Sequence, residues 1–256
     1  MLRFFRKIRQ QYVQSGAFSK YLMYAVGEIA LVVIGILLAL AITNANEDRL
    51  TRNKEHVYLQ GLQRDFMASR MKLVELLRVN EQNYAEAKRI ANYMSNEEEV
   101  PTEQELSELL FQAFAYDISF NPNNSLLAEM ISSGSLKDLS NAELRKQLTN
   151  WNAFLDDIAR QEADLRDQRE KLLDIFREDQ YHIRTVLDQV GASEEIMGLG
   201  ASRGSHSNLD VLNSTAFENS LMIFILTSIL TETEHYQPLL VELDAILTAI
   251  SSEVEE

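Results

Sequence analysis

Cysteine, proline and glycine are scarce in this chain of 256 residues, which contains no cysteine, three prolines and nine glycines. Without cysteine there can be no disulfide bond, no thiolate metal site and no cysteine nucleophile. Proline and glycine mark turns, and few stretches show the alternating β-branched pattern that is typical of strands. The composition therefore predicts an all-α protein.

Motifs for catalysis and cofactor binding are lacking as well. The four histidines form no HExxH or other spaced metal pair, and no GxSxG elbow supports a catalytic triad. Neither GxxxxGK nor GxGxxG occurs, so no motif supports nucleotide binding. We predict no catalytic residue, no metal and no cofactor, and we expect that the protein is not an enzyme. The sequence leaves open whether it binds a small-molecule ligand.

Positive charge outweighs negative charge only near the N-terminus. The formal net charge is −15, yet residues 1–46 hold five basic groups and one acidic group, while the remainder holds 19 basic and 38 acidic groups. A surface this acidic matches phosphates poorly, so we expect no nucleic-acid partner. The five basic residues instead suit the anionic lipids of a cytoplasmic membrane surface. They are Arg3, Arg6, Lys7, Arg9 and Lys20.

Residues 1–20 are predicted to form a basic, amphipathic cytoplasmic tail. Within residues 2–14, apolar side chains recur at spacings of three and four, which is typical of a helix that lies in the membrane interface. The same basic residues can also act as a plain topology signal. We favour this simpler interpretation.

A long apolar run follows, from Tyr21 to Ile42. At about 1.5 Å per residue, a helix of this length spans the hydrocarbon core of about 30 Å. Because Lys and Arg precede the run, we predict a transmembrane helix over 21–43, a cytoplasmic N-terminus, and residues 44–256 outside the cytoplasm. The alternative is a cleavable signal peptide, since Ala39-Leu40-Ala41 has the small-x-small form of a cleavage site. The run exceeds a usual signal core of about 7–15 residues, so we favour a retained anchor.

Glu28 is the only charged residue inside the apolar run. A carboxylate in a spanning helix costs about 2.5–3.5 kcal/mol on insertion scales, so a compensating role is expected. Glu28, Gly35 and Ala39 fall on one helical stripe, where the small pair would let a second helix approach closely. One hypothesis places Glu28 in a helix–helix interface, in a homo-oligomer or against a partner membrane protein. In the other, Glu28 lies only about 10 Å into the run, where it is either protonated or reaches toward Lys20 and lipid headgroups.

Several short stretches carry a family resemblance, among them Phe4-Phe5-Arg6-Lys7-Ile8-Arg9, Gly27-Glu28-Ile29 and Asn46-Glu47. Over residues 4–47 the chain resembles an uncharacterised family of single-pass membrane proteins from Bacteroidota-type bacteria. Ala45 departs from that family, in which an interfacial tryptophan is common at this place. The resemblance implies a protein of the bacterial inner membrane with a periplasmic helical domain. It implies no activity.

Beyond the anchor, heptad patterns predict long helices that pack against one another. From about residue 46 to residue 93 the core-facing positions are Leu59, Leu62, Phe66, Leu73, Leu76, Ala87, Ile90 and Met94. Ser69, Asn80 and Asn83 occupy the same series. Polar residues there either fix the register of packing or mark a stretch that faces water, and we expect that they face water.

Capping signals divide the middle of the chain. Thr102 and Glu105 form a capping box that predicts a helix to about residue 116. Residues 121–124 should break the chain, and a short helix over 125–132 should end at Gly134. The polar side chains around these turns could line a pocket, but turn chemistry alone explains them.

Two further helical regions are expected. Ser140 and Glu143 form a second capping pair, which predicts a helix of about 45–50 residues. Residues 191–208 lack periodicity and form a loop, either functional or disordered. The last region runs from about 214 to 254, with a kink or restart at Pro238. Its predicted core-facing series is Met222, Leu226, Ile229, Tyr236, Leu240, Leu243, Leu247, Ile250 and Val254.

The expected architecture is a basic tail, one spanning helix and an elongated antiparallel helical bundle over residues 44–256. Two functions fit it. The first is a membrane-anchored envelope interaction or scaffold protein that self-associates through the membrane stripe and the heptads. The second is a ligand-binding sensor that reports through a partner membrane protein. A sensor should enclose an apolar pocket with a few polar groups, whereas a scaffold should expose a broad apolar or charged face.

Overall fold

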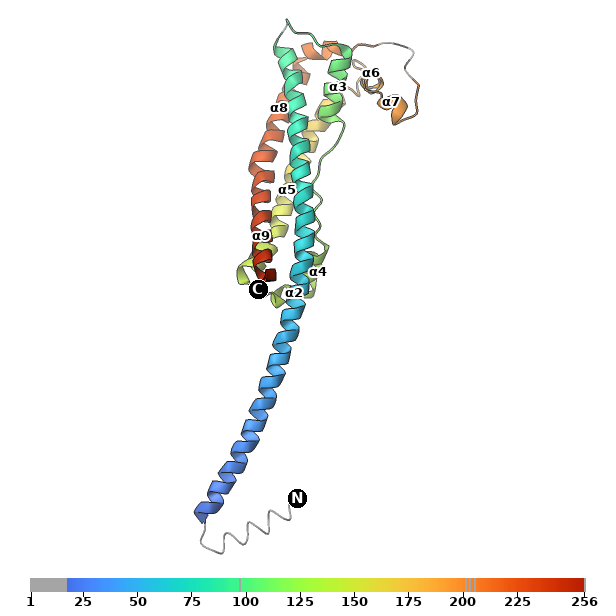
Figure 1. Cartoon of the computed structure of the whole chain (residues 1–256). Coiled ribbons are helices and arrows are strands. Elements are labelled where there is room, and N and C mark those ends of the chain that lie inside the picture. Colours follow the sequence, from blue (N-terminus) through green and yellow to red (C-terminus); the bar gives the residue numbers. More distant parts are fainter. Residues whose placement is uncertain (1–17, 97, 201, 203, 205, 256) are drawn as a thin grey trace. The chain divides into compact units, whose positions relative to one another are not determined.

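The computed structural model describes residues 18–96, 98–200, 202, 204 and 206–255. All regular elements among these residues are helices, so the predicted all-α fold is confirmed (Figure 1). The chain divides into two compact units, Met1–Val57 and Tyr58–Glu256. Arg3, Arg6, Lys7 and Arg9 lie outside the described residues, as does the amphipathic segment predicted over 2–14.

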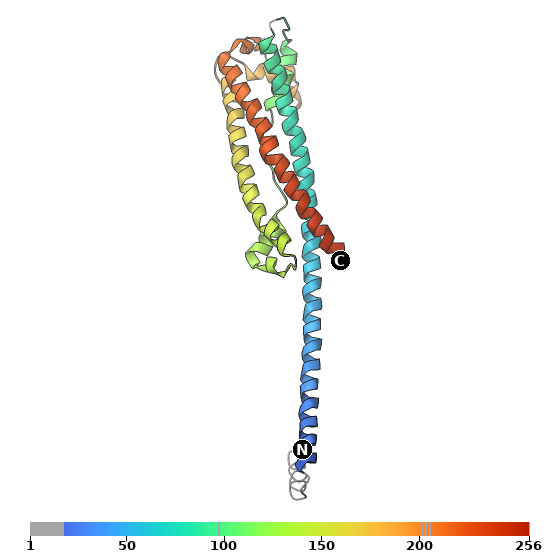
Figure 2. The same ribbon diagram turned by 90° about the vertical axis from the view of Figure 1, so that its left-hand side faces the viewer.

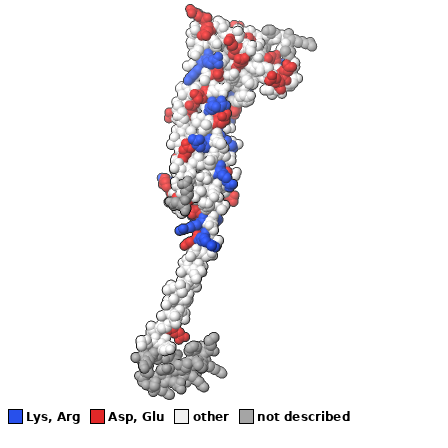
Figure 3. Space-filling model, in the orientation of Figure 1, with Lys and Arg blue, Asp and Glu red and all other residues white. Residues whose placement is uncertain are grey.

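The first unit contains the start of helix α2 (Phe18–Ser95). Its apolar side chains are exposed, including Leu31 at 72 % and Ile42 at 70 %. Figure 3 shows this part of α2 as an almost uncharged stretch. Among the described residues, α2 alone is long and apolar enough to cross a membrane, and none of its apolar stretch is buried inside the protein. Its length and composition are thus compatible with a membrane anchor.

In the second unit the rest of α2 lies beside α5 (Ala142–Ile175) and a third long helical stretch (Figures 1 and 2). That stretch consists of α8 (Thr215–Leu230), the π-helical turn η3 (Thr231–Tyr236) and α9 (Gln237–Glu255). The shorter elements are α3 (Glu103–Phe114), α4 (Ser125–Ser133), η1 (Ser135–Asp138), α6 (Ile183–Gln189), α7 (Ala192–Glu195) and η2 (Leu209–Asn213). Burial of the apolar stripes of these amphipathic helices holds the bundle together.

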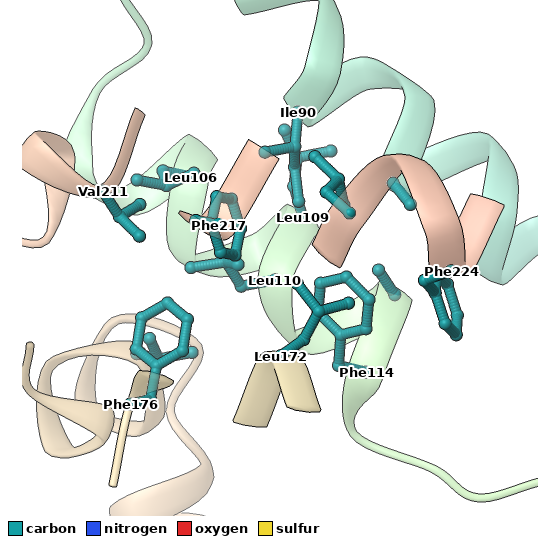
Figure 4. Packing of buried hydrophobic residues seen from close by; sticks show 14 of the residues in the cluster. Ile90, Leu106, Leu109, Leu110, Phe114, Leu172, Phe176, Val211, Phe217 and Phe224 are labelled. Carbon is teal, nitrogen blue, oxygen red and sulfur yellow. The ribbon is translucent and has the colours of Figure 1, made fainter. Parts of the chain in front are cut away.

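Two apolar clusters form the core of the bundle. The first joins α2, α3, α5 and α8, and its Phe114 and Phe224 rings meet edge to face with centroids 5.1 Å apart (Figure 4). The second joins α2, α4, α5 and α9 around Phe66 and Trp151, whose ring centroids are also 5.1 Å apart. Each such aromatic pair adds about 0.5–1.5 kcal/mol beyond area burial. Most of the core-facing positions predicted for residues 46–93 are buried here.

The first predicted helix cap is confirmed and the second is wrong. Thr102 Oγ1 accepts from the Glu105 N–H at 3.2 Å, and the Glu105 carboxylate accepts from the Thr102 N–H at 2.8 Å. At the start of α5, however, Asn141 is the N-cap, and its Oδ1 accepts from the Glu143 and Leu144 N–H groups at 3.0 Å each. Asn and Ser are about equally good caps, so neighbouring candidates cannot be ranked by propensity.

Helix α5 is shorter than the predicted 45–50 residues because a distant side chain holds the turn that follows it. Asn208 is fully buried, and its Oδ1 accepts from the His182 N–H at 2.8 Å. Its Nδ2 donates to the His182 carbonyl at 3.0 Å. These bonds hold His182 in an extended conformation between α5, which ends at Ile175, and α6, which begins at Ile183. The segment predicted as the 191–208 loop contains α7.

The π-helical turn η3 corrects the core-facing series predicted for the last region. Met222 and Leu226 are 53 % and 57 % exposed, so their predicted burial is wrong. The buried series is Phe217, Leu221, Phe224, Ser228, Thr231, Tyr236, Leu239, Leu243, Ile246 and Ile250. Its step from Thr231 to Tyr236 is five residues, which a π-helical turn accommodates and an α-helix does not. Pro238 lies in the first turn of α9, directly after the π-helical turn, and α8, η3 and α9 follow one another without a break.

Candidate functional site

Helix α8 presents an apolar surface to solvent. Residues 219–231 carry no charged side chain, and the helix is apolar on all sides. One side is buried in the bundle core. The opposite side, here called the α8 face, consists of Met222, Ile223, Leu226 and Leu230, which are 44–57 % exposed. Figure 2 shows α8 between α5 and α2 with nothing drawn in front of it. A helix that is apolar all round is normally buried, so this face is unusual for a solvent-exposed helix.

Acidic residues lie on the helical stretch at both ends of the α8 face. Glu218 precedes Met222 by four residues, and Glu234 follows Leu230 by four. Both are exposed. Glu218 lies one α-helical turn before Met222, and Glu234 lies in the π-helical turn about one turn after Leu230, so each carboxylate is within about one turn of an end of the face. The sequence prediction missed this surface because it placed Met222 and Leu226 in the core.

Buried polar groups surround the π-helical turn inside the bundle. We call this group the polar layer, and it consists of Asn80, Glu162, Ser228, Thr231 and Tyr236. Glu162 is 5 % exposed. Its Oε1 accepts from the Phe120 N–H at 2.7 Å and from the Tyr236 hydroxyl at 2.9 Å. Burial raises the pKa of the Glu162 carboxyl, and the two hydrogen bonds oppose that rise. Burial also raises the pKa of the Tyr236 phenol, and the nearby Glu162 carboxylate raises it further.

The polar layer connects three long helices. Asn80 Nδ2 of α2 donates to the Ser228 carbonyl at 3.0 Å and to Glu232 Oε2 at 3.5 Å. Gln161 of α5 donates to Thr231 Oγ1 at 2.9 Å. A shift of one helix by a single residue would leave these buried groups unpaired, so the layer fixes the register of packing.

The prediction that Ser69, Asn80 and Asn83 face water is wrong, because all three are buried. Ser69 Oγ donates to the Asp65 carbonyl and accepts from the Asn123 N–H, each at 2.8 Å. The Asn83 side-chain amide faces the Val79 and Gln112 carbonyls, to which Nδ2 donates in the amide orientation that satisfies both. The partners of these polar groups come from distant segments as well as from α2, which explains why a heptad pattern alone could not distinguish burial from exposure.

A groove of about 820 Å³ runs along α2 beside the segment that follows α3. Its apolar lining includes Leu76, Val79 and Phe120, and its charged lining includes Lys72, Glu75, Arg78 and Asp117. Met71 and Tyr116 on its rim are 68 % and 62 % exposed, so the groove is open to solvent. Asn80 lines a neighbouring recess of about 10 Å³, and its buried Oδ1 has no hydrogen-bond partner. That volume is about the size of one water molecule.

The intramembrane candidates Glu28, Gly35 and Ala39 all lie on α2 in the first unit and are exposed. A Cβ atom added at Gly35 would meet no atom within 4 Å, so there is room beside this glycine. Lys20 also lies in α2. The proposed interface of these residues with another helix stays a prediction.

The histidines form contacts that the sequence did not indicate. His182 and His206 stack with ring centroids 3.9 Å apart, and His235 Nδ1 lies 3.0 Å from Asp157 Oδ2. Hydrogen bonds from Arg160 and then from His235 lower the pKa of Asp157. Within the described parts of the chain, no group of three or more His, Asp or Glu side chains is arranged to hold a metal ion.

Comparisons with known proteins identify a family. Residues 28–176 match the model of a family of unknown function, DUF6090. This match covers more than half of the chain, from Glu28 to Phe176, and α8 lies beyond it. No curated protein and no solved structure matches. The chain thus belongs to the DUF6090 family.

Proposed function

We propose that this protein is a membrane-anchored, non-enzymatic interaction or scaffold protein of the bacterial envelope. Its N-terminal apolar helix anchors it in the inner membrane, with the N-terminus in the cytoplasm and the bundle in the periplasm. The exposed α8 face carries the proposal, since it has the apolar character of a surface that binds another protein. The excess of Lys and Arg before the apolar run supports the orientation.

Substitutions on the α8 face test this function. Met222→Gln together with Leu226→Gln removes apolar contact from two side chains that are more than half exposed. We expect the double variant to fold normally, because neither side chain belongs to the core. The assembly that a mild detergent extracts from native membranes should become smaller. Val100→Gln with Val241→Gln is the matched control, since both valines are 71 % exposed and lie elsewhere. An assembly of the same size in all three proteins would refute the proposal.

Self-association through the membrane segment is a second part of the proposal. It rests on Glu28, Gly35 and Ala39 sharing one helical stripe, with room beside Gly35 for another helix. Light scattering of the detergent-extracted full-length protein should give the mass of an oligomer. Glu28→Gln should lower that mass if the carboxyl group lies in the interface. A monomeric wild-type protein would exclude self-association.

The groove along α2 supports a second candidate function, a ligand-binding sensor that acts through a partner membrane protein. Its volume of about 820 Å³ is within the usual range for ligand sites, roughly 300–1,000 Å³. Ligand sites usually enclose most of their ligand, however, whereas this groove is open along a rim that includes Met71 and Tyr116. We therefore favour the interaction protein.

A further inference from the structure

We propose that the α8 face binds an amphipathic helix of a different protein, whose apolar stripe has Lys or Arg at both ends. This inference rests on the proposed interaction function and specifies its partner. The face offers Met222, Ile223, Leu226 and Leu230 to an apolar stripe, and Glu218 and Glu234 offer carboxylates beyond its ends. Apolar contact supplies affinity, and the charges at the ends select the partner.

The two carboxylates argue against a second copy of this chain on the face. Two α8 helices packed in parallel would bring Glu218 near Glu218 and Glu234 near Glu234. Packed antiparallel, they would bring Glu218 near Glu234. Both arrangements place like charges together at the two ends of the contact, which disfavours the pairing. The wider surface adds to this repulsion, because residues 47–256 hold 38 acidic and 19 basic groups.

The spacing of the face defines the partner. Glu218 and Glu234 are 16 residues apart, which corresponds to about 24 Å of helix. A matching helix needs about five turns, with cationic residues near its ends and apolar residues between them. Long Lys and Arg side chains can lie along an apolar surface and still reach a carboxylate, so they suit these positions.

The size of the face indicates where the partner resides. Four half-exposed side chains cover far less than the roughly 800 Å² per partner that a stable interface buries. Such a contact is weak between freely diffusing proteins. Attachment of both proteins to one membrane raises their effective concentration and can make the contact persistent. We therefore expect a partner that is itself held at the same membrane.

Site-specific photocrosslinking in cells tests this inference with the full-length chain. A benzoylphenylalanine replaces Ile223 in the α8 face, and a second protein carries it at Val241 as a control. We expect a crosslink from position 223 to a protein other than this chain, on a segment with Lys or Arg at both ends of an apolar stripe. Position 241 should not give that product. Mass spectrometry of the crosslinked peptide identifies the segment.

Charge reversal provides the second readout. Glu218→Lys with Glu234→Lys should lower the yield of the crosslink at least about fivefold, because two attractions become repulsions. Glu129→Lys with Glu178→Lys is the matched control, since both residues are exposed and lie on other segments. The control should leave the yield unchanged.

The possible outcomes separate this inference from the proposed function. A crosslink to a second copy of the chain, or to a protein segment without basic ends, overturns the inference and leaves an interaction function in place. A crosslink to a different protein that is insensitive to charge reversal does the same. A crosslink to lipid alone, or no crosslink, overturns both.

Discussion

The polar layer makes a quantitative prediction for Tyr236→Phe. The ring is fully buried, and its hydroxyl donates to Glu162 Oε1 at 2.9 Å. The variant keeps the ring but leaves the Phe120 N–H as the remaining donor described for that oxygen. A hydrogen bond to a charged group contributes about 1.5–3 kcal/mol, and one between neutral groups contributes about 0.5–1.5 kcal/mol. The loss of unfolding free energy should therefore be about 1.5–3 kcal/mol where Glu162 is ionised and smaller where it is protonated.

Urea unfolding of the full-length protein in lipid nanodiscs measures this loss. Trp151 is the only tryptophan and is buried beside Phe66, so its fluorescence reports on the bundle. The measurement is repeated from acidic to neutral pH with Tyr116→Phe as the control, since Tyr116 is 62 % exposed. A loss below about 0.5 kcal/mol at neutral pH, which is the usual range of surface substitutions, would refute the role assigned to this hydrogen bond. A loss that does not change with pH would refute the link to Glu162.

Three other variants test the helix cap, the polar layer and the π-helical turn. Asn141→Ala should lower the unfolding free energy by about 1 kcal/mol or more, as urea unfolding would show, because Asn141 caps α5. A loss below about 0.5 kcal/mol would contradict its role as the N-cap. Because the pKa of Glu162 is raised in the folded protein, the folded state binds this proton more tightly than the unfolded state does. Ionisation of Glu162 therefore lowers the stability of the protein as pH rises from about 4.5 through the folded pKa. The stability of Glu162→Gln relative to wild type should therefore increase over that pH range, and a flat difference would contradict the burial of this carboxyl. Deletion of Thr233 should abolish cooperative unfolding because it removes the five-residue step of the core-facing series. The control Thr233→Ala should unfold with a free energy within about 0.5 kcal/mol of wild type. Cooperative unfolding of the deletion variant would show that the step is dispensable.

Local signals in the sequence were sufficient for much of the fold. The capping box of Thr102 and Glu105 and the left-handed Gly134 depend on neighbouring residues alone, and both were predicted. The helix over residues 46–93 was predicted because its apolar side chains repeat with helical period. The all-α class followed from composition and periodicity.

Features that depend on distant contacts were not predictable. The turn between α5 and α6 is held by Asn208, which lies 26 residues beyond its partner His182. The π-helical turn shifts the series of core-facing residues by one position, and a constant heptad cannot represent such a shift. The α8 face was missed for this reason, because the constant heptad placed Met222 and Leu226 in the core. The polar layer was missed because Glu162 and Asn80 have partners on other helices.

The cysteine-free sequence allows a direct test of whether the α8 face is covered in the working protein. Ile223→Cys and Val241→Cys each create a single thiol at an exposed position, 51 % and 71 % exposed in the wild type. The rate of labelling by a thiol reagent is measured for both variants in native membranes and in the purified full-length protein. We predict that Cys at position 223 is protected in native membranes and reactive after purification, while Cys at position 241 reacts at similar rates in both. Equal reactivity of position 223 in the two preparations would contradict the proposal that this face binds a partner.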